Sequence, residues 1–353
     1  MTKTIFTRVA SVAVTATVLG GLLAGTAAAR DLTVVSWGGA YQDAQRKFMF
    51  GPFAGSAAIK VVDEYWEGGI GILRTKIKGG DNNWDVVQVE AEEQAIGCEE
   101  GLFEKLDYSR IGGKERFLPG TTGECGVGAV IYNVVLAYDT AKPGPAPTGW
   151  ADFFDTTKFP GKRAMRNGPK WNLEIALLGD GVAPGEIYKV LSTPEGVDRA
   201  FKKLDSIKSD LLFWKSGAQP AQMLAAGDVM MTTTFNSRVT ASNENDGTKF
   251  GIVWKDSLYT MDSWVIMKGS PLLDQSYQLV EYATRAAPQA ALPQFNRSGP
   301  TNKDAIALVP AAYMGDLPSN QDNFKVAIPD SPDFWIDNFD DLNERWSAWA
   351  GSN

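Results

Sequence analysis

The sequence predicts an α/β protein of two lobes behind an N-terminal export signal. Short runs rich in β-branched residues alternate with helix-like stretches across residues 32–89, a pattern typical of a mostly parallel sheet. A second α/β set follows the proline-rich segment 142–147, in which neither a strand nor a helix can continue. Of the 353 residues, 324 follow position 29. That length exceeds one ordinary hydrophobic core, so we expect two lobes.

Residues 1–29 have the three parts of a secretory signal peptide. Lys3 and Arg8 give a cationic start, residues 9–24 are apolar and uncharged, and small residues precede a cleavage point near Ala29. The apolar run is too short to make a good membrane span. We therefore expect a soluble protein that is exported to the periplasm.

The charge balance indicates which partners to exclude. Residues 1–29 hold two basic and no acidic residues, so the remainder has 32 basic and 42 acidic residues, a net charge of −10. Nucleic acids and anionic membranes both require a basic surface. We expect neither as a partner, and we expect a monomer.

The two cysteines, Cys98 and Cys125, both follow the predicted signal. In an exported chain an isolated pair is typical of a disulfide. The competing interpretation is a metal site with two thiolates, but the chain has no histidine and the spacing matches no zinc pattern. The sequence therefore predicts one disulfide, no metal and no cofactor.

The absence of histidine also restricts catalysis. A Ser-His-Asp triad, a Cys-His pair and a histidine-ligated metal are all impossible. No glycine-rich phosphate loop follows a predicted strand. Catalysis by a pair of carboxylates stays open, but the sequence favours binding, and we expect no enzyme.

The first part of the chain predicts three strands and two helices before residue 90. Strands are expected at residues 32–35, 59–62 and 84–89, and helices at residues 43–48 and 71–78. Parallel sheets bind ligands at the carboxyl ends of their strands. We therefore expect the loops 36–42 and 90–93 to contribute to a ligand site.

The second part continues the pattern. Strands are predicted at residues 126–139, 163–165 and 229–234, and helices at residues 172–178, 194–207 and 218–226. Two later strands, at residues 252–254 and 263–267, would return to the first lobe.

Several motifs in this order resemble the periplasmic solute-binding proteins of ABC importers, of the spermidine/putrescine-binding type. They lie at residues 34–42 (Val-Val-Ser-Trp-Gly-Gly-Ala-Tyr-Gln), 84–87, 98–125, 213–219, 227–230, 261–266 (Met-Asp-Ser-Trp-Val-Ile) and 299–302. The resemblance implies a type II binding protein, with a hinge of crossing strands and lobes that close on a ligand. It also implies delivery to a membrane permease. By similarity, residues 30–138 and 261–305 form lobe 1, and residues 139–260 and 306–353 form lobe 2.

The resemblance also implies ligand-binding positions, each with a simpler alternative. Trp37 matches an aromatic residue of the first loop, although it could be a core tryptophan. Asp262 matches a carboxylate that pairs with a ligand ammonium, although it could be an exposed acid at a strand start. Phe235 matches a larger aromatic residue that packs on the ligand, although it could belong to the core. Glu90 stands where polyamine binders have a small hydroxyl residue, and could instead belong to a solvated acidic face.

Three departures from the polyamine pattern favour a different ligand. Trp171 stands where polyamine binders have a second carboxylate, and Thr260 replaces an aromatic residue. Arg238 follows Phe235 closely and would repel a diamine, whereas it would bind a ligand carboxylate; it could also be a surface arginine. One acid for an amine and one arginine for a carboxylate indicate a zwitterion, such as γ-aminobutyrate, a related amino acid or an opine-like compound.

The leading hypothesis is therefore a solute-binding component of an ABC importer that captures a small amine-bearing metabolite. A polyamine binder of the same fold is the first alternative. A secreted hydrolase with a carboxylate pair is a more distant one, and a receptor module that signals ligand occupancy is a third.

Overall fold

The computed structural model describes residues 1–2, 30–80 and 82–352. The predicted signal peptide lies outside these residues, apart from its first two. All described helices and strands belong to a unit that spans residues 31–353.

The strands form one sheet of nine, in the order β2-β1-β3-β8-β4-β7-β5-β6, with β9 paired to β8. Among the described strands, the four pairs that do not involve β4 or β8 are all parallel: β1 with β2 and β3, and β5 with β6 and β7. The strands are β1 (Leu32–Ser36), β2 (Val61–Tyr65), β3 (Val86–Val89), β4 (Gly126–Asp139), β5 (Arg163–Arg166), β6 (Leu211–Trp214), β7 (Met231–Phe235), β8 (Phe250–Ile266) and β9 (Ile328–Pro329).

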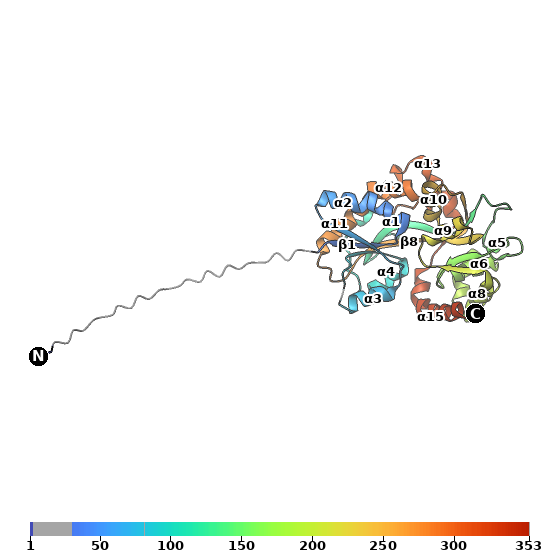
Figure 1. Ribbon diagram of the computed structural model, residues 1–353, viewed down its shortest axis with the longest axis horizontal. Helices are drawn as coiled ribbons and strands as arrows, with labels where there is room; N and C mark the ends of the chain where they lie inside the picture. The colour runs from blue at the N-terminus through green and yellow to red at the C-terminus, as the bar shows by residue number, and fades with distance from the viewer. Residues whose placement is uncertain (3–29, 81, 353) are drawn as a thin grey trace. The chain divides into compact units, whose positions relative to one another are not determined.

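Helices cover the sheet and occupy most of the connections between its strands (Figure 1). They are α1 (Gly39–Gln45), α2 (Gly51–Ala57), α3 (Ile70–Lys78), α4 (Ala91–Glu99), α5 (Trp150–Phe154), α6 (Asn172–Gly179), α7 (Ile187–Leu191), α8 (Pro194–Asp205), α9 (Gln219–Ala226), α10 (Asn236–Asn245), α11 (Leu273–Ala283), α12 (Ala286–Asn296), α13 (Ala311–Met314), α14 (Gln321–Lys325) and α15 (Pro332–Gly351). This is the α/β class that the sequence predicts.

Strand β1 shows why both faces of the sheet need helices. Successive side chains of a strand point to opposite faces. Leu32 and Val34 pack into a core with Met49 and residues of α11, whereas Val35 packs into a second core with Leu73 of α3. Because both sets are fully buried, the strand is apolar on both faces, as expected for a parallel sheet between helices.

Strands β4 and β8 run through the middle of the sheet and join its two halves. The first residues of β4 pair with the end of β8, which also pairs with β3. Farther along, residues 134–138 of β4 pair with β7. The half with β1, β2 and β3 and the half with β5, β6 and β7 are therefore connected by crossing strands, as the predicted hinge requires. The exact lobe boundaries stay a prediction.

One prediction about the strands was wrong. Residues 252–254 and 263–267 were expected to be separate strands, but a single strand of 17 residues, β8, contains nearly all of both. Asp256 in its middle has a φ of 57°, and the pairing of β4 with β8 shifts register between Val134 and Leu136. This irregular polar segment resembles a turn in the sequence, but the pairing with β4 is present on both sides of it, at Val253 and at Leu258.

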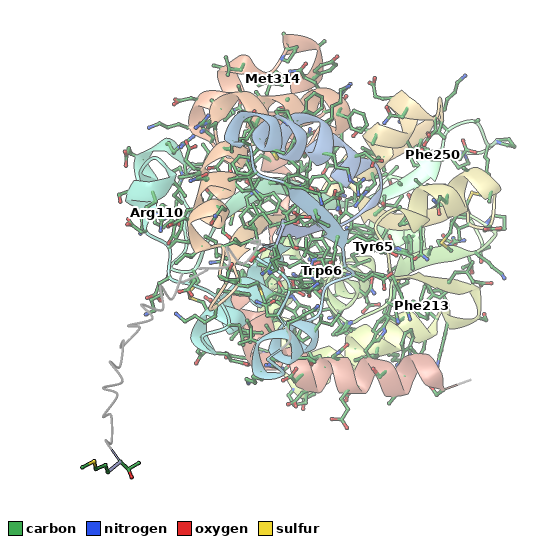
Figure 2. All side chains as sticks on the ribbon, turned by 60° about the vertical axis from the view of Figure 1, so that its left-hand side comes forward. Tyr65, Trp66, Arg110, Phe213, Phe250 and Met314 are labelled. Carbon is green, nitrogen blue, oxygen red and sulfur yellow. A yellow bond between two sulfur atoms is a disulfide. The ribbon has the colours of Figure 1, made fainter. Side chains whose placement is uncertain are left out.

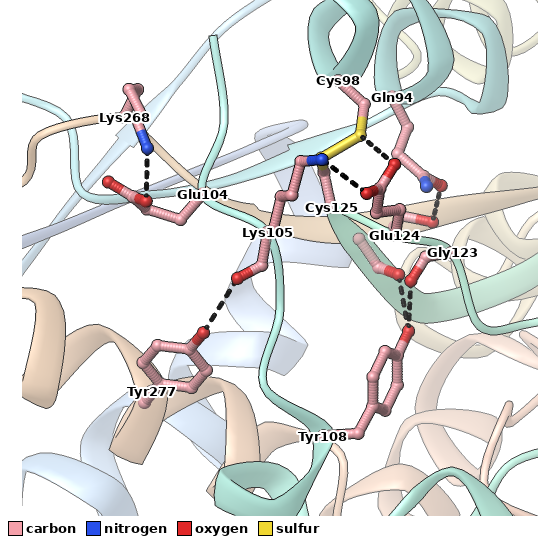
Figure 3. Close-up of a disulfide and its surroundings, with 12 residues drawn as sticks. Gln94, Cys98, Glu104, Lys105, Tyr108, Gly123, Glu124, Cys125, Lys268 and Tyr277 are labelled. Atoms are coloured by element: carbon pink, nitrogen blue, oxygen red, sulfur yellow. Dashed lines mark hydrogen bonds and ion pairs between the residues drawn. A yellow bond between two sulfur atoms is a disulfide. The ribbon is translucent and has the colours of Figure 1, made fainter. Parts of the chain in front are cut away.

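The predicted disulfide between Cys98 and Cys125 is confirmed (Figure 3). It ties the end of α4 to the residue before β4. The loop between them is also held by the hydroxyl of Tyr108, which donates to the carbonyl oxygens of Gly123 and Gly126. Among the described helices, none is both long and apolar enough to cross a membrane.

Candidate ligand-binding site

A cavity lies where the carboxyl ends of strands from both halves of the sheet face each other. Its volume, including the part open to solvent, is about 580 Å³. Five strands deliver a wall residue at or just after their carboxyl ends: Trp37, Glu90, Arg166, Trp214 and Phe235. The loops 36–42 and 90–93 therefore contribute, as the position of ligand sites in parallel sheets predicts.

Aromatic rings form most of the apolar wall. Trp37 stacks on Trp66, with ring centroids 5.3 Å apart and an angle of 20° between the planes; Figure 2 labels Trp66. On the other side, Phe235 makes edge contacts with Tyr132 at 5.2 Å and with Trp214 at 5.7 Å. Such walls suit an aliphatic chain and also attract an ammonium group.

Asp262 supplies a buried carboxylate, with 4% of the residue exposed. The hydroxyl of Tyr132 donates to Oδ1 at 2.8 Å, and Nε2 of Gln88 donates to Oδ2 at 3.1 Å. Within the described residues Asp262 forms no ion pair. Burial, aided by the charge of Glu90, raises the pKa of Asp262 well above its ordinary value. The carboxyl group therefore favours its neutral form until a cation approaches it.

A hydrogen-bond network behind the cavity fixes the position of Gln88. Its Oε1 accepts from Nε2 of Gln45 at 2.8 Å and from the hydroxyl of Ser36 at 3.1 Å. Its Nε2 also donates to the hydroxyl of Tyr41 at 2.8 Å. All four residues are buried. Because the amide of Gln88 is fixed on these sides, Asp262 is held in one orientation.

Arg238 supplies a buried guanidinium, with 6% of the residue exposed. It donates to the backbone oxygens of Trp37 at 3.1 Å and Gly38 at 3.0 Å. Within residues 30–80 and 82–352 it has no carboxylate partner. Burial lowers the pKa of Arg238 to about 10, so the group stays charged at neutral pH. It links α10 to the loop 36–42 without forming an ion pair among the described residues.

Glu90 differs from Asp262 because its charge is already paired. Oε1 lies 2.5 Å from Nη1 of Arg166, and Oε2 lies 3.2 Å from Nζ of Lys170. Burial opposes ionisation of Glu90, but these two cations outweigh it and lower the pKa to about 2. The carboxylate of Glu90 is thus ionised, and both of its oxygens already contact a cation of the protein.

Trp171 lies behind the cavity wall. It is 1% exposed, and its ring packs edge-on against the rings of Phe235 and Tyr132, with ring centroids 5.6 and 6.5 Å apart. The guanidinium of Arg166 and the ammonium of Lys170 both face this ring, at 4.8 and 4.6 Å from its centroid. Trp171 has a φ of 67°, which is rare for a bulky residue.

The structure brings five of the six predicted ligand-binding positions to one cavity: Trp37, Glu90, Phe235, Arg238 and Asp262. The alternatives that required exposure are wrong for the charged residues: Glu90 is 5% exposed, Arg238 6% and Asp262 4%. The other departure from the polyamine pattern, Thr260, is buried and donates to Oδ2 of Asp330 at 3.3 Å.

Sequence reasoning missed several wall residues, above all Tyr132, Arg166 and Trp66. Tyr132 lies in a mostly apolar strand, and nothing in the local pattern distinguishes it as a ligand contact. Arg166 ends a short strand, and its partner Glu90 is 76 residues earlier. Among the described residues, no cluster of cysteine and acidic side chains could hold a metal ion.

Comparisons with known proteins agree with this arrangement. Residues 52–318 match the model of a family described as bacterial extracellular solute-binding proteins. The chain is also 42% identical, over 327 residues, to a γ-aminobutyric acid-binding protein of Pseudomonas aeruginosa, and the alignment covers 93% of each chain. The chain belongs to the bacterial extracellular solute-binding proteins.

Solved structures show the same fold for this solute-binding protein. The binding protein MotA of A. tumefaciens B6, in complex with glucopine, has a TM-score of 0.86 and 30% identity, with 91% of this chain and 100% of that chain covered. The protein described as the Atu4243-GABA receptor has a TM-score of 0.80 and 33% identity, with 92% of this chain and 98% of that chain covered. The fold is the two-lobed type II fold of periplasmic binding proteins, as the sequence predicted.

Proposed function

We propose that this protein is the periplasmic solute-binding component of an ABC importer, and that its ligand is a small zwitterion of the γ-aminobutyrate type. The relative from Pseudomonas aeruginosa and the GABA receptor are both named for this ligand. An opine-like compound, which also has amine and carboxylate groups, is a longer member of the same class.

The observation that carries the proposal is that one cavity holds a carboxyl group and a guanidinium, and neither has an ionic partner among the described residues. Asp262 and Arg238 are both buried and both line the cavity, and within the described residues neither forms an ion pair. A buried charge without a partner is costly. A zwitterion supplies an ammonium for Asp262 and a carboxylate for Arg238, while Trp37 and Phe235 contact the carbon chain.

The rest of the proposal follows from the predicted architecture. Lobe 1 consists of residues 30–138 and 261–305, and lobe 2 of residues 139–260 and 306–353. The lobes close on the ligand by bending at the crossing strands β4 and β8, and a membrane permease receives it. The exported form begins near Arg30, acts as a monomer without a nucleic-acid partner, and releases its ligand chemically unchanged.

Four compounds with the same carbon chain test the proposal by calorimetry. γ-Aminobutyrate has both charges, butylamine lacks the carboxylate, butyrate lacks the amine, and putrescine has two amines. We expect γ-aminobutyrate to bind at least about 100-fold more tightly than each of the other three, because only it satisfies both charges. Equal or tighter binding of putrescine would instead support the polyamine alternative.

A further inference from the structure

We infer that Arg166 and Lys170 are specificity-determining residues. They form ion pairs with the carboxylate of Glu90, so that this carboxylate cannot bind the second ammonium of a diamine. The inference rests on the proposed function, because it explains why one of two carboxylates in the cavity is open to a ligand amine. In the proposed binding mode, Asp262 binds the ligand amine and Arg238 binds the ligand carboxylate, so neither Arg166 nor Lys170 pairs with the ligand.

The cavity wall holds two buried carboxylates, Glu90 and Asp262. Glu90 lies close enough to Asp262 to raise the pKa of that carboxyl group, and the charges of both acids act on Tyr132. Taken by themselves, these two carboxylates would suit two ammonium groups. Their partners differ: among the described residues, Asp262 accepts hydrogen bonds from two neutral side chains and forms no ion pair, whereas Glu90 pairs with two cations.

The two cations are themselves fixed in place. Arg166 and Lys170 both lie over the ring of Trp171. Lys170 is 4% exposed and also contacts Glu92 at 2.5 Å and Asp330 at 3.3 Å. Moving Lys170 away from Glu90 would therefore disturb two further buried acids.

A ligand ammonium must compete with these internal partners. Arg166 ends β5, Lys170 lies four residues later, and Glu90 follows β3, so the pairs join the two halves of the sheet within one chain. Intramolecular partners have a high effective concentration, which a dissolved diamine does not match. Its second ammonium is then desolvated without a carboxylate, which is unfavourable.

The test is a gain of diamine binding. Arg166→Met removes the cation with the shorter contact and keeps an unbranched, largely apolar side chain in its place. We expect the affinity for putrescine, relative to that for γ-aminobutyrate, to rise at least about tenfold, as measured by calorimetry. Glu90→Gln in the same variant should cancel the gain, because the freed carboxylate is then absent. Lys170→Met gives a second, independent route to the same gain if Arg166→Met does not fold.

A matched control is available in Arg74, which pairs with Glu100 at 2.6 Å away from the cavity. Arg74→Met should leave the ratio unchanged. If the unsubstituted protein binds γ-aminobutyrate and folded Arg166→Met and Lys170→Met show no gain for putrescine, the inference is wrong and the proposed function stands. If the protein does not bind γ-aminobutyrate but Arg166→Met raises the affinity for putrescine itself at least about tenfold, the exclusion of diamines stands and the proposed ligand is wrong.

Discussion

The hydroxyl of Tyr132 donates a 2.8 Å hydrogen bond to Oδ1 of Asp262, across the pair of strands that joins the two halves of the sheet. Beside this contact the pairing of β4 with β8 shifts register, between Gly128 and Val130, and Val130 is the residue opposite Asp262. Bulges of this kind often redirect a side chain at a functional site. The carboxylate is thus presented to the cavity by the hinge strands themselves.

Asp262→Asn should weaken binding of γ-aminobutyrate at least about tenfold, because the amide keeps the shape and removes the charge that pairs with the amine. Calorimetry on the purified variant measures this. Glu67→Gln is a suitable control, since Glu67 is an exposed acid of the same cavity. Unchanged affinity in Asp262→Asn would remove Asp262 from the site.

The same substitution should not lower the stability of the ligand-free protein at neutral pH. The pKa of Asp262 is raised in the folded state, so its contribution to stability is greatest at low pH and is lost as pH rises. The amide of the Asp262→Asn variant does not titrate and has no such dependence. Urea unfolding of both proteins near pH 8 measures the difference, and a loss of several kcal/mol would show that the ionised carboxylate stabilises the fold.

Ligand binding should release a proton. The carboxyl group of Asp262 has a raised pKa when the cavity lacks a ligand, and an ammonium beside it lowers that pKa. Between the two pKa values the affinity therefore increases with pH. Titrations from about pH 5 to about pH 8, in buffers with different ionisation enthalpies, measure the released proton. The Asp262→Asn variant should not show this release, and a proton release that persisted there would assign it to another group.

Arg238→Met separates two roles of this side chain. If Arg238 binds the ligand carboxylate, the variant loses affinity for γ-aminobutyrate at least about tenfold, while the weak affinity for butylamine is unchanged. If Arg238 serves only to join α10 to the backbone of Trp37 and Gly38, both ligands lose affinity equally. Calorimetry with the two ligands distinguishes these results.

Replacing Cys98 and Cys125 by alanine should lower the free energy of unfolding by about 3–4 kcal/mol, because the disulfide closes a loop between residues 27 apart. The comparison requires chemical unfolding of the exported protein and of the double variant. Ligand affinity should change little, since neither cysteine lines the cavity. Identical unfolding curves would contradict the stabilising role.

In the first half, the sequence predicted β1, β3 and α3 close to their observed bounds. The predicted bounds of α1 and β2 were displaced, and α2 and α4 were not predicted. The β8 strand was divided into two because its polar middle resembles a turn. Asp262 and Arg238 were identified by motif and by charge. Arg166 was not, because its role depends on a contact with Glu90 that the topology creates and no local pattern reveals. For the same reason, the sequence suggested Trp171 as a ligand contact, whereas the structure shows it against two cations.

A crystal structure of the protein with γ-aminobutyrate tests the central claim most directly. We expect the ligand ammonium within about 3 Å of a carboxylate oxygen of Asp262, and the ligand carboxylate at a similar distance from the guanidinium of Arg238. Glu90 should remain paired with Arg166 and Lys170. A ligand whose ammonium contacts Glu90, or whose carboxylate lies away from Arg238, would contradict the account.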